Sequence, residues 1–321
     1  MTGAQQPVAG VGDRSCCLSS EAMTSKSYAV ILEGLDRFLA RCEILGLGDR
    51  ARESRFSRYR GILEELVEVV RLSREGQLTA ERQATLSQHR GEYLAALFDG
   101  DQISDIAPYL EDFESALLKR KLRDVLSGPP LLRDEDPNTN QSRNILFELL
   151  LAARLRRAGL NPKIGERPDV TCILGGEAVG FECKRLFSEG QLLGRVAQAA
   201  SMLRQIAAEV PEAPKQGVVV ISVAKLFSAA HVPLRMADQG PIRAFLDEWL
   251  GQLAGATKDG RNGWEQWIRA GSVVGILFHV TGIFENVTVG RFDFGEQWLG
   301  AYYRESRGFL ELGEKLRATA H

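Results

Sequence analysis

The sequence predicts a mixed α/β protein in two parts, an all-α domain followed by a sheet with helices on both of its faces. Apolar residues recur at spacings of three and four through residues 28–126, as in amphipathic helices. After residue 140, short β-rich segments alternate with helical ones, which is typical of a mixed sheet covered on both sides. The length of 321 residues suits about two domains of ordinary size.

Composition excludes several classes of protein. With 44% hydrophobic and 26% charged residues, the chain is an ordinary globular protein, and no segment reaches the roughly 18 to 20 apolar residues of a membrane span. A net charge of -2 excludes a general polyanion binder, so any nucleic-acid site is local. Five scattered cysteines show no zinc spacing, and four separated histidines form no metal motif. We therefore expect reduced thiols and a cytoplasmic location.

Turn residues divide the first part of the chain. Residues 1–25 are polar, lack the apolar core of a signal peptide and are predicted to be a disordered leader. Residues 26–128 form the predicted all-α domain, for targeting, regulation or self-association. The sequence Gly128-Pro129-Pro130 ends its last helix, and the polar residues 129–141 form the predicted linker.

The second predicted domain covers residues 142–321. It begins with a helix that ends at Gly159, and a long amphipathic helix follows two short strands. The expected helices are 142–158, 190–210 and 242–253, and the expected strands are 170–174, 178–184, 217–224, 272–280 and 286–294.

Gly175-Gly176 predicts a two-residue hairpin, because both glycines can adopt the positive φ of a primed turn. A turn centred on this pair places Asp169 opposite Glu182. Lys184 lies two residues beyond Glu182, and the period of a strand returns it to the same face. The hairpin therefore gathers two carboxylates and one ammonium group in one patch.

Like charges opposite each other in a sheet are destabilising, so a cation is expected between Asp169 and Glu182. A hard divalent ion, Mg²⁺ or Mn²⁺, takes one or two carboxylates and completes its shell with water and phosphate oxygens. Lys184 can then orient a metal-bound water or neutralise phosphate charge. The plainer alternative is that Asp169 ends a strand while Glu182 and Lys184 decorate a solvated edge.

Glu148 is a further candidate, on the helix predicted at 142–158. Its neighbours at helical spacings include Ile145, Leu151 and Ala152, and most of that helix is apolar. A carboxylate buried there is costly unless it is paired or binds a metal. The alternative is an exposed stripe, or a bond to a nearby arginine.

These residues resemble the motif of the PD-(D/E)XK nuclease superfamily: Glu148 on a helix, Pro168-Asp169 as the "PD" and Glu182-Cys183-Lys184 as the "ExK". The likeness covers roughly residues 140–224. It implies a restriction-endonuclease-like αβββαβ core and Mg²⁺- or Mn²⁺-dependent DNA cleavage. It also implies that Asp169, Glu182 and the backbone carbonyl of Cys183 bind the metal, joined by Glu148, and that Lys184 is the catalytic lysine.

Local charge agrees with a nucleic-acid site. Residues 141–205 carry ten Lys and Arg against six Asp and Glu, although the whole chain is slightly acidic. Arg154, Arg157 and Arg185 are candidate phosphate contacts, and Gln198 lies on the helix that follows the motif. For each of these, a position on a solvated helix face is the alternative interpretation.

The sequence thus predicts a metal-dependent endonuclease that hydrolyses phosphodiester bonds. Its expected partners are DNA rather than RNA, and a second copy of the chain in a homodimer, with no membrane partner. One alternative is a non-catalytic nucleic-acid-binding or scaffold protein that retains a nuclease-like fold. Another is a metal-independent α/β module that binds a protein partner.

Overall fold

The structure is a computed structural model of the chain. The structure describes residues 22–24, 26–136, 139–226, 234–236, 244, 248, 252, 273–286, 291–301 and 307–318. In this part of the chain the protein is a mixed α/β structure, as the sequence predicts.

The first part of the chain is helical, in agreement with its apolar periodicity. Ser27, Ser54 and Thr79 begin three of the helices by accepting a hydrogen bond from an N–H two or three residues later. The helices are α1 (Tyr28–Ile44), α2 (Gly48–Glu53), α3 (Arg55–Arg74), α4 (Ala80–Gln88), α5 (Arg90–Ile106) and α6 (Ser115–Val125), with a 3₁₀ helix at Ala107–Asp112.

The second part begins with a helix, followed by three strands, a second helix and a fourth strand. These are α7 (Gln141–Arg157), β2 (Lys163–Ile164), β3 (Val170–Leu174), β4 (Glu177–Arg185), α8 (Leu192–Glu209) and β5 (Gln216–Ser222). Five more elements follow from the described residues: β1 (Ala22–Thr24), β6 (Leu234–Met236), β7 (Val273–Asn286) and β8 (Arg291–Ala301) join the sheet, and α11 (Arg307–Ala318) comes after them.

Within the described residues the sheet has eight strands, in the order β1-β8-β7-β5-β4-β3-β2, with β6 paired to β7 beside this row. Strands β2, β3 and β4 form an antiparallel meander, whereas β4, β5 and β7 run parallel. The connection from β4 to β5 contains α8, as a parallel crossover requires.

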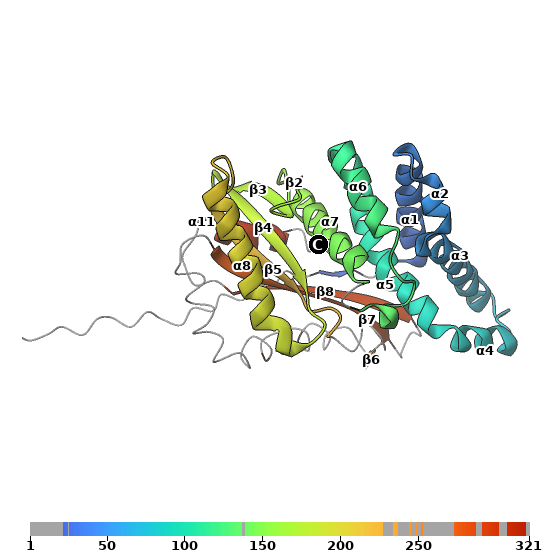
Figure 1. Cartoon of the computed structure of the whole chain (residues 1–321). Helices are drawn as coiled ribbons and strands as arrows, with labels where there is room; N and C mark the ends of the chain where they lie inside the picture. Colours follow the sequence, from blue (N-terminus) through green and yellow to red (C-terminus); the bar gives the residue numbers. More distant parts are fainter. Residues whose placement is uncertain are drawn as a thin grey trace, which may run out of the picture.

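Helices cover both faces of the sheet. Val218 and Val220 of β5 pack in the same cluster as α7, while Val219 and Ile221 pack with the apolar side of α8. Figure 1 shows α1 to α6 gathered at one side of the molecule and the sheet at the other, with α7 between them. Because it is covered on several sides, α7 is buried along most of its length.

The hairpin forms as the glycine pair predicts. Gly175 and Gly176 have φ of 59° and 84°, both in the region that glycine favours. Val170 pairs with Phe181 and Leu174 pairs with Glu177, which is the predicted register.

Three details differ from the sequence expectations. Residues 22–24, expected within the leader, form β1 and pair with β8. Strand β7 continues to Asn286 and β8 begins only at Arg291, because the antiparallel pairing of β7 with β8 extends that far. The leader residues 1–21 and most of the helix predicted at 242–253 lie outside the described residues.

The helical part and α7 share one continuous apolar core. A buried charge cluster joins them: Asp99 of α5 accepts from Nε of Arg55 on α3 at 2.8 Å and from Nη2 of Arg143 on α7 at 2.9 Å. All three side chains are almost fully buried. The predicted linker 129–141 therefore joins two parts that pack tightly on each other.

Among the residues that the structure describes, no helix is both long and apolar enough to cross a membrane. Cys42, Cys172 and Cys183 are buried, free thiols.

Candidate functional site

The hairpin and α7 bring the predicted site residues into one neighbourhood. Asp169 directly precedes β3, Glu182 and Lys184 lie on β4, and Glu148 lies on α7. Asp169, Glu182 and Glu148 are each at least nine-tenths buried. The plainer interpretation of a solvated strand edge is therefore wrong for Glu182, whereas Asp169 does lie at the end of a strand.

Asp169 lies where β3 and β4 separate. The pairing of the two strands ends at Val170 and Phe181, so the next residues of β4 have no partner in β3. There the side chain of Asp169 takes the place of a strand partner: its Oδ2 accepts from the backbone N–H of Cys183 at 2.8 Å. This bond fixes the carboxylate at the edge of β4.

Glu182 and Lys184 form a direct ion pair on β4. Nζ of Lys184 lies 2.6 Å from Oε1 of Glu182 and donates also to the carbonyl of Cys183 at 3.1 Å. Glu182 is only 1% exposed. Its second oxygen, Oε2, is buried and has no hydrogen-bond partner among the described residues.

Glu148 is held by a lysine from the helical part of the chain. Oε2 of Glu148 accepts from Nζ of Lys121, which lies on α6. Both side chains are about nine-tenths buried. The arginine partner suggested as an alternative from the sequence is thus replaced by Lys121.

Burial raises the pKa of all three carboxyl groups. For Glu148, burial and then repulsion from Asp169 raise the pKa to about 7, in spite of the nearby Lys121. Burial and then Asp169 raise the pKa of Glu182, against the effect of Lys184. Burial also raises the pKa of Asp169, although the N–H of Cys183 and both lysines oppose the shift. Burial therefore outweighs the nearby positive charges of Lys121, Lys184 and Arg167.

The site fits a hard cation through few protein ligands. Among the residues that the structure describes, no three His, Cys, Asp or Glu side chains form a ready-made metal-binding group. Mg²⁺ requires only one or two carboxylates and takes its other oxygens from water and substrate. The free Oε2 of Glu182, the adjacent Asp169 and the carbonyl of Cys183 satisfy that requirement.

Two of the predicted phosphate contacts need correction. Arg154 is buried and forms ion pairs with Asp105 at 2.7 Å and with Glu296. Arg185 is buried and pairs with Glu135. Neither guanidinium can reach a phosphate in this structure, because each neutralises a buried carboxylate instead.

The other two predicted contacts are accessible but have different surroundings. Arg157 is partly exposed, at 3.9 Å from Asp105. Gln198 is exposed on α8 and accepts from Arg195 at 3.1 Å. Since Val196, Ala199 and Leu203 face the sheet, Gln198 lies on the outer side of α8 and is not a residue of this site.

Lys121 is the residue of the site that was not identified from the sequence. It belongs to a run of basic residues, Lys119 to Arg123, that indicates a solvated face. A sharper signal is its spacing, because Leu118, Leu122 and Val125 place Lys121 on the apolar side of α6. A lysine at such a position requires a buried carboxylate partner.

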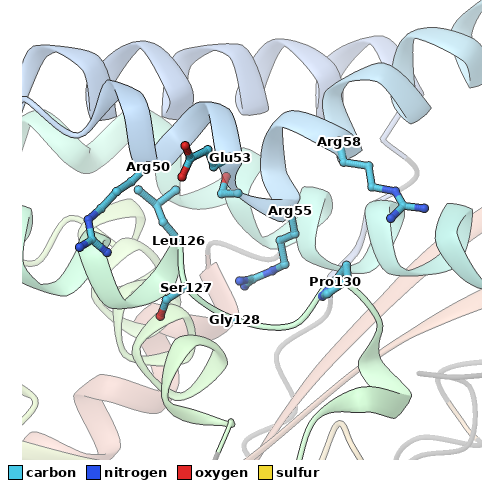
Figure 2. Close-up of a pocket in the computed structure, with 9 residues that line it drawn as sticks. Arg50, Glu53, Arg55, Arg58, Leu126, Ser127, Gly128 and Pro130 are labelled. Carbon is cyan, nitrogen blue, oxygen red and sulfur yellow. The ribbon is translucent and has the colours of Figure 1, made fainter.

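A separate cavity of about 400 Å³ lies between α2, α3 and the loop 126–130. Figure 2 shows Arg50 and Arg58 at opposite ends of it, with Arg55 between them beside the loop. Arg55 is held by Asp99, and none of the predicted site residues line the cavity. It is therefore distinct from the carboxylate site.

Comparisons of the chain with family models, with curated proteins and with solved structures found no match. The chemistry of Asp169, Glu182, Lys184 and their neighbours is therefore what bears on function.

Proposed function

We propose that the chain is a divalent-metal-dependent nuclease that hydrolyses phosphodiester bonds, in DNA rather than RNA. One observation carries the proposal: three buried carboxylates from α7, the start of β3 and β4 repel one another, and a lysine two residues from Glu182 lies against them. A stable fold has no need of such repulsion unless a cation relieves it.

The arrangement of elements supports a restriction-endonuclease-like core as part of this proposal. The chain from α7 to β5 runs helix, three strands, helix, strand, with the candidate motif on the second and third of these strands. This is the order implied by the resemblance to the PD-(D/E)XK superfamily.

Asp169, Glu182 and the backbone carbonyl of Cys183 would hold Mg²⁺ or Mn²⁺. When bound, the ion supplies an acidified water and neutralises charge on the phosphate. The chain's own groups position these parts: the N–H of Cys183 fixes Asp169, and Lys184 orients Glu182. Lys184 is about one-sixth exposed, so its ammonium group can also reach a phosphate oxygen at the edge of the site.

The proposal is tested by incubating the purified protein with plasmid, linear duplex, single-stranded DNA and RNA, in Mg²⁺, Mn²⁺ or EDTA. We expect Asp169→Ala and Glu182→Ala each to abolish cleavage, since either change removes a ligand. Lys184→Ala should lower turnover on the order of 10² to 10³-fold and affect DNA binding less. Cleavage that continues in EDTA, or that survives Glu182→Ala undiminished, would contradict the proposal.

Two further variants calibrate this experiment. Glu148→Ala should have a weaker effect than loss of either ligand, about 10 to 100-fold, as expected of an outer group. Glu177→Ala is the matched control, because Glu177 is exposed at the other end of β4 and only accepts from Gln216. Its activity should equal that of the wild type.

A non-catalytic nucleic-acid-binding protein is the second candidate, and the ion pairs favour it. Lys184 and Lys121 already neutralise Glu182 and Glu148 in part, so the fold can persist without a metal. In that case EDTA would leave the affinity for DNA unchanged, and no substrate would be cut.

A further inference from the structure

Lys121 belongs to the helical part of the chain, yet its ammonium group pairs with a carboxylate of the candidate site. It lies on α6, and its side chain is one-tenth exposed. Leu118 and Leu122 are fully buried around it on the same side of that helix. An ammonium group in such a position is stable only with a counter-charge, which Glu148 provides.

Glu148 is the third carboxylate of the site, after Asp169 and Glu182. Two-metal sites place their ions about 3.5 to 4 Å apart, and the second ion needs carboxylate oxygens of its own. Here the carboxylate that could serve a second ion is already bound to Lys121. The site contains the ammonium groups of Lys121 and Lys184 for three carboxylates, and the charge of Arg167 also acts on Asp169 and Glu182. One divalent cation therefore suffices to leave the site without a deficit of positive charge.

We propose that Lys121 is a positioning residue that takes the place of a second metal ion. It holds Glu148 in an ion pair, so that the site binds one divalent cation, on Asp169 and Glu182, and Glu148 stays outside its coordination. This inference rests on the proposed metal site and fixes its stoichiometry. It also makes the helical part of the chain a contributor to the site.

The test counts Mn²⁺ ions bound to the full-length protein, by equilibrium dialysis combined with electron paramagnetic resonance of the free ion. Binding that is lost in Asp169→Asn/Glu182→Gln is assigned to the site. We expect one site-bound ion in the wild type and two in Lys121→Met, because the freed Glu148 becomes available to a second ion. Lys121→Arg keeps the positive charge and should bind one.

Two variants separate this role from a merely structural one. Lys121→Met/Glu148→Gln removes both charges of the pair and should return the count to one, although the buried ion pair is lost. Lys119→Met changes a lysine on the same helix that does not pair with Glu148, and should also bind one ion. Circular dichroism establishes that each variant is folded, and if Lys121→Met unfolds, the wild-type count still tests the inference, because two site-bound ions would overturn it.

The outcomes distinguish this inference from the proposed function. Two site-bound ions in the wild type, or one in folded Lys121→Met, would overturn the role of Lys121 and leave a metal nuclease intact. No site-bound ion in the wild type would overturn both. One ion in the wild type with no cleavage of any substrate would support the stoichiometry and contradict the nuclease.

Discussion

Each buried carboxylate of the candidate site has a raised pKa, and this has a consequence for stability. A carboxyl group whose pKa is higher in the folded than in the unfolded protein stabilises the fold below its unfolded pKa, and that contribution is lost as the pH rises through the folded value. The pKa of Glu148 rises from its usual value of 4.5 to about 7, and those of Asp169 and Glu182 also rise. The contribution of Glu148 is therefore lost between about pH 4.5 and 7, and those of Asp169 and Glu182 are lost as the pH rises through their own raised pKa values.

We predict that Glu182→Gln raises the melting temperature of the metal-free protein at pH 8, with little gain at pH 4.5. The amide is neutral, so it removes repulsion from Asp169 and still offers an oxygen to Lys184. Differential scanning fluorimetry in EDTA across this pH range measures the effect. Glu177→Gln, exposed on the same strand, is the control and should change nothing. Equal stabilisation at both pH values would show that ionic repulsion is not the cause.

The charge of Arg154 stabilises the fold and does not bind a substrate phosphate. Burial alone would raise the pKa of its partner Glu296, but the charge of Arg154 and a hydrogen bond from His279 outweigh burial and lower that pKa to about 2. Nη2 of the same guanidinium, which pairs with Glu296, also lies 2.7 Å from Oδ2 of Asp105. Arg154 thus neutralises two carboxylates inside the protein.

We predict that Arg154→Met destabilises the protein by about 3 to 5 kcal/mol, because it leaves buried carboxylates uncompensated. Urea denaturation at pH 7 measures the loss. Arg157→Met changes a partly exposed neighbour and should lower the free energy of unfolding by about 1 kcal/mol at most, as is usual for surface ion pairs. If Arg154→Met instead left stability unchanged and weakened DNA binding, the sequence-based assignment to phosphate contact would regain support.

At the scale of elements, the hairpin was predictable because its signal is local. Two adjacent glycines determine the turn, and the turn determines the pairing of β3 with β4, so Asp169 and Glu182 could be placed together from the sequence. The burial of Glu148 was one of the interpretations that the sequence offered, since most residues of its helix are apolar. These inferences need no knowledge of distant contacts.

Other features depend on contacts between segments far apart in the chain. Arg154 meets Glu296 across 142 residues, and Lys121 meets Glu148 across 27. The length of β7 depends likewise on its pairing with β8. Charge and periodicity mark such residues as polar or apolar, but a basic residue on a helix has the same appearance whether it binds phosphate or a buried carboxylate.

For the hairpin itself, we predict that Gly176→Val costs about 1 to 2 kcal/mol, the penalty for a side chain in left-handed backbone. No atom lies within 4 Å of a Cβ placed there, so the cost is conformational and not steric. Gly175→Asn should cost less, since asparagine tolerates this conformation. Chemical denaturation compares the two variants. A Gly176→Val variant as stable as the wild type would mean that the turn can rearrange, and with it the register that brings Asp169 to Glu182.

At the scale of the whole molecule, the two predicted domains are joined by more than a linker. Strand β4, α7 and the helices α5 and α6 contribute to one apolar core. Asp99 binds Arg55 on one side and Arg143 on the other, so it links α5 to both α3 and α7. The ion pairs of Lys121 with Glu148 and of Arg154 with Asp105 add further buried bonds across the same boundary.

We therefore predict that residues 129–321 do not form a stable fold when expressed alone. Without the helical part, α7 loses its contacts with α5 and α6, and Arg143 and Glu148 lose their charged partners. The full chain should melt in one calorimetric transition, with equal calorimetric and van't Hoff enthalpies. The fragment should bind a hydrophobic dye and show no cooperative transition. Asp99→Asn in the full chain is a less severe test. It should lower the midpoint of thermal unfolding while the transition stays single, since it weakens the contact between the two parts without removing it. Two separate transitions in the full chain, or a sharp one in the fragment, would mean that the parts fold independently, and that the active site of the proposed nuclease can form without Lys121.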